Sequence, residues 1–241
     1  MSIIKHIPNS ITSMNLLCGA LGVIFTFQGR TDIAFYMMAA AAVCDFFDGF
    51  SARLLNVYSP LGKELDSLAD LVSFGLLPSI MLHRLCISNG ISGILSYIPL
   101  AIVVFSALRL AKFNIDERQC ENFIGLPTPA CAMLCGSFTY YVFNDPTSAL
   151  NQWASSRFFI PAGAVVLSLL LVSEIPMFSM KFKKNMKSGT PIHKQRVAFA
   201  GVIFVSTVFT VLLGLNWSMI IILTFVSYII MNIGTKILFR K

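Results

Sequence analysis

Apolar residues form long runs along most of the chain, and proline, glycine, asparagine or charged residues separate one run from the next. A helix needs about 20 apolar residues to cross a bilayer. The second and third runs also contain acidic residues, so their assignment rests partly on a motif described below. The pattern predicts an all-α polytopic membrane protein with eight transmembrane helices, at residues 9–28, 32–56, 64–86, 93–114, 124–143, 157–174, 197–214 and 217–238.

The composition supports this interpretation. Of the 241 residues, 56% are hydrophobic and only 12% are charged, and the mean hydropathy is +0.77. A soluble domain carries roughly 25% charged residues, so these values exclude both a soluble globular enzyme and a disordered chain. We expect one membrane domain over residues 1–241, with catalytic helices at about 9–181 and two further helices at 197–238.

The basic residues predict the orientation. With eight spans, only Arg30, Arg84 and Arg157 of the 18 lysines and arginines fall on one side of the membrane. Cytoplasmic loops carry the excess of lysine and arginine, so we expect both termini in the cytoplasm. The net charge of +7 then reflects topology and attraction to anionic membrane lipids. It gives no support for nucleic-acid binding.

Four of the eleven acidic residues lie close together in the sequence. Asp45 and Asp48 are three residues apart, and Asp66 and Asp70 are four apart, so each pair shares one face of its helix. A turn at residues 56–62 folds these two helices into an antiparallel pair. We therefore expect the four carboxylates to converge at the cytoplasmic ends of the second and third helices.

Converging carboxylates need a counter-charge. Each aspartate within a bilayer costs roughly 2.5–3.5 kcal/mol on insertion scales, and unpartnered carboxylates repel one another. Hard divalent cations prefer oxygen ligands. The cluster therefore predicts one or two Mg²⁺ or Mn²⁺ ions held by the aspartates.

The residues around the aspartates indicate a phosphate-containing substrate. Gly49 and Ala52 leave the helix surface bare, so a ligand can approach the backbone, and Gly62 keeps the turn open. Arg53 offers a planar guanidinium for phosphate oxygens. Together with the metal, this set suits a pyrophosphate substrate with a lipid tail, whose reaction uses a carboxylate as general base.

The acidic stretch has the pattern D-x2-D-G-x2-A-R-x8-G-x3-D-x3-D, which resembles the signature of the CDP-alcohol phosphotransferase family at every fixed position. Lys112 is a departure, because arginine is expected there. Further segments resemble the branch of this family that makes phosphatidylserine: Ile7–Thr12 with Asn15, Leu16 and Gly19, Asp70–Gly75, Arg109–Asn114, Gly125–Ala130, and Val172–Pro176 with Ser179 and Lys181.

The resemblance implies transfer of the phosphatidyl group from CDP-diacylglycerol to the hydroxyl of L-serine, with release of CMP. It implies that Asp45, Asp48, Asp66 and Asp70 ligate the metal, and that Asp70 also acts as general base. It further implies a homodimer. The residues that it assigns to the CDP moiety are Gly49, Ala52, Arg53, Ser59, Gly62, Asn9 and Thr12.

The acceptor site is less defined by the sequence. Arg109, Lys112 and Asn114 end the fourth helix, where they either bind serine or anchor the helix at the membrane surface. Ser73 either reaches the substrate or packs between helices, and Thr128 either bonds serine or begins the fifth helix. Two alternatives stay open: the same chemistry with glycerol 3-phosphate or inositol phosphate as acceptor, and transport of divalent cations.

Overall fold

The computed structural model describes residues 6–57, 59–116, 123–178 and 191–238. Ser179 and Lys181, which contributed to the family resemblance, lie outside these residues. The elements are α1 (Ile7–Phe27), α2 (Thr31–Leu54), α3 (Pro60–Asp70), the π-helical turn η2 (Leu71–Leu76), α4 (Leu77–Ser88), α5 (Ile94–Tyr97), the 3-10 turn η3 (Ile98–Leu100), α6 (Ala101–Ile115), β1 (Phe123–Ile124), α7 (Thr128–Asn144), α8 (Ala149–Ala154), α9 (Phe159–Val172), β2 (Pro176–Met177), α10 (Pro191–Leu212) and α11 (Ser218–Leu238).

Six helical segments among the described residues are long and apolar enough to cross a membrane: Ile7–Phe27, Thr31–Leu54, Pro60–Ser88, Ile94–Ile115, Gln195–Leu212 and Ser218–Thr235. They confirm the expectation of an all-α polytopic membrane protein. Helices also occupy the fifth and sixth predicted ranges, but α7 and α9 have only 17 and 14 residues. The count of eight spans therefore stays a prediction.

Prolines and short strands explain where the predicted ranges differ from the helices. The range 124–143 begins too early, because β1 ends at Ile124 and α7 starts only at Thr128, beside Pro127 and Pro129. β1 pairs antiparallel with β2, which follows α9. This two-stranded ladder ties the beginning of α7 to the end of α9, and the apolar pattern gave no sign of it.

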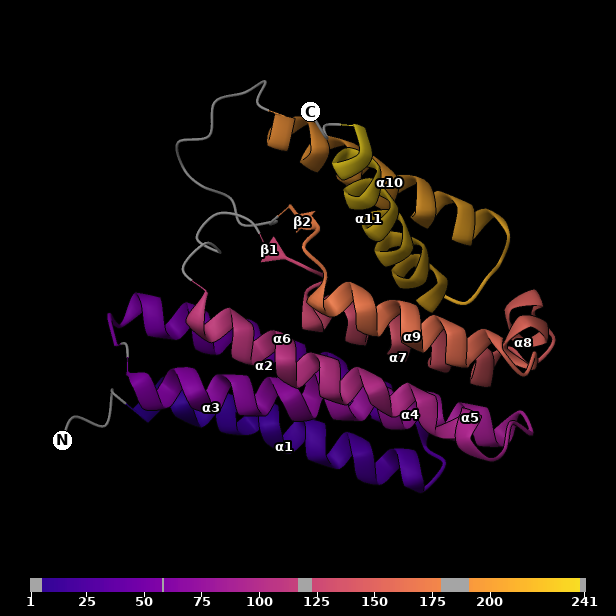
Figure 1. Ribbon diagram of the computed structural model, residues 1–241, viewed down its shortest axis with the longest axis horizontal. Coiled ribbons are helices and arrows are strands. Elements are labelled where there is room, and N and C mark those ends of the chain that lie inside the picture. The colour runs from indigo at the N-terminus through magenta and orange to yellow at the C-terminus, as the bar shows by residue number, and fades with distance from the viewer. Residues whose placement is uncertain (1–5, 58, 117–122, 179–190, 239–241) are drawn as a thin grey trace.

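The helices form a layered bundle in which α1 is central to the first layer. α1 packs along α2 and also contacts α3, η2 and α4, while α7 packs against α2 and α4. α9 packs against α6, α11 against α7, and α10 against α11. In Figure 1, the long helices between α1 and α9 run roughly parallel, and the α10–α11 pair lies above them at a slant.

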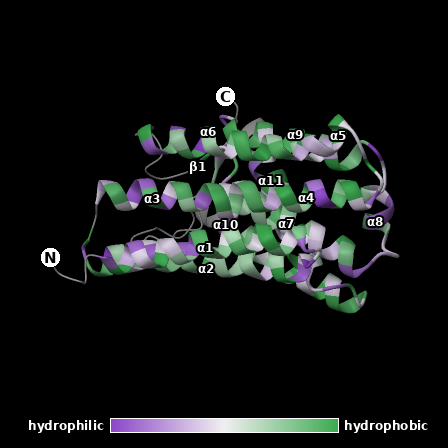
Figure 2. Cartoon of the chain, turned by 90° about the horizontal axis from the view of Figure 1, so that it is seen from below, coloured by the Kyte–Doolittle hydropathy of each residue, from purple (hydrophilic) through white to green (hydrophobic). Residues whose placement is uncertain are grey.

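Apolar side chains fill the space between the layers and also cover the outside. One buried cluster includes Phe35, Met38, Phe74 and Leu77 from α2, η2 and α4. Figure 2 shows hydrophobic residues along most of each helix, whereas hydrophilic residues gather at α3 and the neighbouring ends of α1 and α2. The polar end of the bundle is therefore where the motif aspartates lie.

A tight connection between α2 and α3 sets the spacing of the two motif halves. Asn56 adopts the left-handed conformation with φ of 52°, and the Val57 N–H donates to the Ala52 carbonyl at 3.0 Å, which closes α2 in a Schellman arrangement. Ser59 then caps α3, because its Oγ accepts from the Gly62 N–H at 3.0 Å. Both caps lie within the eight-residue spacer of the motif, so the spacer is a structural element.

Candidate active site

Three of the four motif aspartates meet in one cluster. Asp45 and Asp48 come from α2 and Asp66 from α3, and one carboxylate oxygen of each lies within 4.8 Å of the other two. Asp48 is buried, and the other two are half-buried. The predicted convergence of the two motif halves is therefore present for these three residues.

The cluster has the properties of a divalent cation site. Its donors are carboxylate oxygens, which are the ligands that Mg²⁺ and Mn²⁺ prefer. The Oδ1 of Asp66 is buried and has no hydrogen-bond partner among the described residues. A buried carboxylate oxygen without a partner is costly, and a cation would satisfy it. The residues present therefore fit a divalent metal ion.

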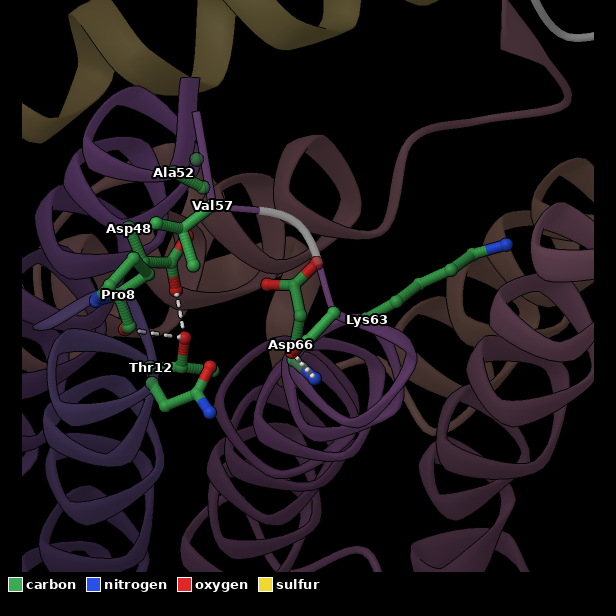
Figure 3. Close-up of a pocket in the computed structure, with 11 residues that line it drawn as sticks. Pro8, Thr12, Asp48, Ala52, Val57, Lys63 and Asp66 are labelled. Atoms are coloured by element: carbon green, nitrogen blue, oxygen red, sulfur yellow. Dashed lines mark hydrogen bonds between the residues drawn. The ribbon is translucent and has the colours of Figure 1, made fainter. Parts of the chain in front are cut away.

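Helix α1 orients Asp48. The Thr12 hydroxyl donates to Oδ2 of Asp48 at 2.7 Å and also lies 3.0 Å from the Pro8 carbonyl oxygen. Figure 3 shows this contact, with Thr12 approaching Asp48 from α1 and Asp66 on the neighbouring helix. Thr12 and Asp48 are both buried. The position of this carboxylate is thus determined by α1 as well as by the motif.

Asp70 lies one turn further along α3 than Asp66 and is 8% exposed. Its Oδ1 accepts a hydrogen bond from Nδ2 of Asn15 at 3.2 Å, and Asn15 is itself fully buried. The Asn15 carbonyl in turn accepts from the Ser73 hydroxyl at 2.9 Å. Ser73 therefore bonds to α1, which agrees with the helix-packing role that the sequence left open for it.

A cavity of about 590 Å³, counted with its open part, adjoins the acidic cluster. The predicted residues that line it are Asn9, Thr12, Asp48, Gly49, Ala52, Ser59, Gly62 and Asp66. A Cβ on Gly62 would lie 3.0 Å from Oδ1 of Asn9 and from Oγ of Ser59, so glycine allows α1 to approach α3 closely here. Arg53 is exposed and does not line this cavity.

The predicted acceptor residues gather at the end of α6. Nη1 of Arg109 donates to Oγ1 of Thr128 at 2.8 Å, and the guanidinium lies 5.9 Å from the Phe113 ring centroid. A second, smaller cavity of about 230 Å³ is lined by Arg109, Lys112, Ile124, Leu171, Val172 and Ser173.

Asn114 lies on a different side from this small cavity. Its Nδ2 donates to Oγ of Ser67 at 2.9 Å, and its carbonyl accepts from Nζ of Lys63 at 2.8 Å. These two bonds join the end of α6 to α3. In this structure Asn114 is engaged in a helix-to-helix contact.

Known proteins resemble the chain in sequence over most of its length. The model of the CDP-alcohol phosphatidyltransferase family matches residues 5–170, a range that contains the acidic cluster and every residue that lines the larger cavity. The chain belongs to this family. It is an enzyme of the phosphatidyltransferase class, and the family resemblance seen in the sequence is confirmed.

Several relatives carry more specific names. The chain is 34% identical to the CDP-diacylglycerol–serine O-phosphatidyltransferase of Bacillus subtilis over 190 residues, which cover 77% of this chain and 98% of that protein. It is 32% identical to the enzyme of the same name from Mycobacterium leprae over 237 residues, 94% of this chain and 74% of that one. It is 30% identical over 172 residues to the archaetidylserine synthase of Methanothermobacter thermautotrophicus, covering 70% and 68%.

Two residues near the acidic cluster and its cavity were not predicted from the sequence. Asn15 was noted only as part of the family resemblance, although its side chain bonds to Asp70. Lys63 lines the larger cavity, but the motif treats its position as variable. The three-residue spacing from Thr12 to Asn15 places both on one face of α1, and this spacing was the one available signal.

Proposed function

We propose that this phosphatidyltransferase moves the phosphatidyl group of CDP-diacylglycerol to the hydroxyl of L-serine, giving phosphatidylserine and CMP. The observation that carries the proposal is the acidic cluster beside a cavity with bare glycine and alanine walls. The names of the relatives support serine as the acceptor.

The reaction needs a base, an aligned donor and a neutralised pyrophosphate. The serine oxygen forms a bond to the phosphorus that carries diacylglycerol, and the bond from that phosphorus to the CMP oxygen breaks, so its electron pair leaves with CMP. Asp70 takes the proton of the serine hydroxyl. Its hydrogen bond from Asn15 leaves the second carboxylate oxygen available for this proton.

The donor site follows from the larger cavity. We place the CDP moiety against Gly49 and Ala52, where no side chain blocks the backbone, with Ser59, Gly62, Asn9 and Thr12 around it. Asp45, Asp48 and Asp66 would hold one or two Mg²⁺ or Mn²⁺ ions, with Asp70 as a further ligand. A bound divalent ion would neutralise the pyrophosphate charge. Arg53 is exposed, so it would reach the phosphates from outside the cavity.

The acceptor site is proposed between Asp70 and the end of α6. Arg109 is buried in α6, and α6 packs against η2, which begins directly after Asp70. A serine carboxylate paired with Arg109 or Lys112 would therefore bring the serine hydroxyl toward the base. Thr128 holds the Arg109 guanidinium in place. Ser73 and Asn114 are engaged with Asn15 and α3, and on this proposal they shape the site indirectly.

The membrane topology is part of the proposal. Eight spans, with α7 and α9 as the fifth and sixth, would place both termini and the active site on the cytoplasmic side. That side holds the soluble substrate and most basic residues. One membrane domain over residues 1–241, working as a homodimer among membrane lipids, completes the proposal.

The archaeal relative supports a second candidate for the lipid donor. Its name is archaetidylserine synthase, which keeps serine and changes the lipid. Diacylglycerol and archaeol differ in how their chains join the glycerol, away from the phosphates. The motif residues contact the head group, so they do not discriminate between these lipids.

CMP release from purified protein in detergent tests the proposal. CDP-diacylglycerol and Mn²⁺ are supplied with serine, glycerol 3-phosphate or inositol phosphate in turn, and Asp70→Asn is compared with Asp32→Asn, whose carboxylate is half-exposed beside Arg30. We expect serine-dependent release that Asp70→Asn abolishes and Asp32→Asn retains. Release with another acceptor would replace serine in the proposal. Folded, metal-loaded protein that releases no CMP with any acceptor would favour cation transport instead.

A further inference from the structure

The last two helices have no part in the site described so far. The family model ends at residue 170, so β2, α10 and α11 lie outside the matched range. Yet α11 packs against α7 and also contacts β2. In Figure 1, the α11 helix lies to the right of β2 and above α9. This arrangement brings side chains of α11 to the segment that follows α9.

Two α11 side chains hold both backbone polar groups of one residue. The Tyr228 hydroxyl donates to the Phe178 carbonyl at 3.1 Å, and the Phe178 N–H donates to Oδ1 of Asn232 at 3.0 Å. Nδ2 of Asn232 also donates to the Tyr228 carbonyl at 2.7 Å. All three residues are buried. Phe178 is therefore fixed to α11 through its backbone.

Aromatic packing reinforces this attachment. The rings of Phe178, Tyr228 and Phe199 form three edge-to-face pairs with centroids 5.0–5.7 Å apart. Such pairs contribute beyond the area that they bury. Phe199 comes from α10, so both C-terminal helices contribute to the contact.

Phe178 directly follows β2, and the β1–β2 ladder links β2 to the segment between β1 and α7, which lies next to the proposed acceptor site. β2 pairs with β1, and the Gly125 N–H donates to the Ile175 carbonyl at 2.9 Å. A Cβ on Gly125 would lie 2.5 Å from the Leu171 carbonyl oxygen, so the two segments are in close contact. Three residues later, Thr128 accepts the hydrogen bond from Arg109.

The same segments form the walls of the small cavity. Its lining consists of Ile124 of β1, Leu171, Val172 and Ser173 at the end of α9, and Arg109 and Lys112 of α6. The position of these walls thus depends on the residue that α11 holds.

We propose that the α10–α11 hairpin is a positioning element of the acceptor site, in which Tyr228 and Asn232 hold the Phe178 backbone and, through the β1–β2 ladder, fix β1 and the end of α9 around Arg109 and Lys112. The inference rests on the proposed function in one respect, the binding of the acceptor beside Arg109. Neither Tyr228 nor Asn232 touches substrate in this scheme. Their loss should therefore weaken acceptor binding selectively.

Helix α7 offers a matched control pair. Nδ2 of Asn144 donates to the Tyr140 carbonyl at 2.8 Å, the same four-residue bond that joins Asn232 to Tyr228. The Tyr140 hydroxyl likewise makes one hydrogen bond, to the Tyr36 hydroxyl. No hydrogen bond recorded for Asn144 or Tyr140 in the described residues reaches the β1–β2 ladder. Asn144→Ala and Tyr140→Phe therefore remove similar groups without touching the proposed path.

Two measurements on the full-length protein test the proposal. In CMP release, Asn232→Ala and Tyr228→Phe should each raise the KM for serine about tenfold, the effect of losing roughly one hydrogen bond. The KM for CDP-diacylglycerol and the half-saturating Mn²⁺ concentration should stay at wild-type values. In hydrogen–deuterium exchange, the amides of residues 123–126 and 173–178 should exchange faster in these two variants. Asn144→Ala and Tyr140→Phe should match the wild type in both measurements.

The outcomes separate this inference from the proposed function. A wild-type protein that releases no CMP with serine overturns the proposed function, and the exchange rates alone then decide whether α11 positions the ladder. Serine-dependent wild-type release with equal serine KM in all four variants overturns the inference. So does unchanged exchange in Asn232→Ala and Tyr228→Phe. Tyr228→Phe keeps the aromatic ring and its packing, so it provides a folded variant if Asn232→Ala does not fold.

Discussion

The contact between α1 and the π-helical turn η2 provides the sharpest test of how Asp70 is positioned. Gly19 of α1 faces Ser73 of η2 so closely that an added Cβ would lie 2.3 Å from the Ser73 Oγ and 2.8 Å from its Cα. A hydroxyl can rotate away, but a backbone carbon cannot. The change Gly19→Ala therefore forces α1 and η2 apart.

The size of the effect follows from these distances. Carbon atoms in contact prefer about 3.5–4.0 Å, so the two segments must separate by roughly 0.7–1.2 Å to relieve the 2.8 Å approach. Overpacking of this kind costs about 1–3 kcal/mol of stability. Ser73 is bonded to the Asn15 carbonyl, and Asn15 is bonded to Asp70, so the displacement reaches the proposed base. A shift of about 1 Å in a catalytic group lowers turnover roughly 100-fold.

The assay compares Gly19→Ala with Gly163→Ala in detergent. Gly163 lies within α9, and nothing stands within 4 Å of a Cβ added there, so this control makes the same chemical change without the collision. We expect kcat for CMP release to fall roughly 100-fold and the melting temperature to fall by several degrees in Gly19→Ala alone. Wild-type kcat and melting temperature in Gly19→Ala would refute the reasoning, because the close approach would then have no role.

Three further predictions concern the residues around the aspartates. Asn15→Leu keeps the side-chain volume but removes the bond to Asp70, so kcat should fall about 10- to 100-fold with little change in either substrate KM. Thr12→Val removes the 2.7 Å bond to Asp48, so the half-saturating Mn²⁺ concentration should rise about tenfold. Thr26→Val is its control, because within the described part of the chain the Thr26 hydroxyl bonds only to the Gly22 carbonyl of its own helix. Chelation with EDTA should abolish CMP release, and Mg²⁺ or Mn²⁺ should restore it; release that survives EDTA would contradict the metal role of the cluster.

Hydropathy and residue spacing predicted the all-α fold and the approximate helix ranges, because a helix that crosses a bilayer needs a long apolar run. All eight predicted ranges contain helices, and the differences are at their ends and in two interior interruptions. The range 93–114 is one apolar run in the sequence, but Pro99 divides it into α5, η3 and α6. The π-helical turn after Asp70 has no comparable signal, and η2 there packs against α1, α6 and α7, which are distant from it in the sequence. Tertiary contacts of this kind cannot be read from a hydropathy pattern.

The site could be predicted only as far as the motif extends. The motif placed Asp45, Asp48 and Asp66 together because i,i+3 and i,i+4 spacing fixes which residues share a face. It could not indicate that Ser73 turns toward Asn15, since that depends on the rotation of η2 about its axis. The side-chain direction of Asn114 also depends on how α6 meets α3.

The positions of the polar residues on α1 explain why the aspartate motif alone does not make a site. Asp48 and Asp70 come from different helices, and α1 supplies one hydrogen bond to each, from Thr12 and from Asn15. Both donors lie on one face of α1, three residues apart. The rotation of α1 about its own axis therefore determines whether both carboxylates receive their hydrogen bonds. A rotated α1 would leave two buried carboxylates without their donors, at a cost of about 1–3 kcal/mol each. The same two bonds that orient the aspartates therefore also select the register in which α1 packs, and Gly19 permits the approach that this register requires.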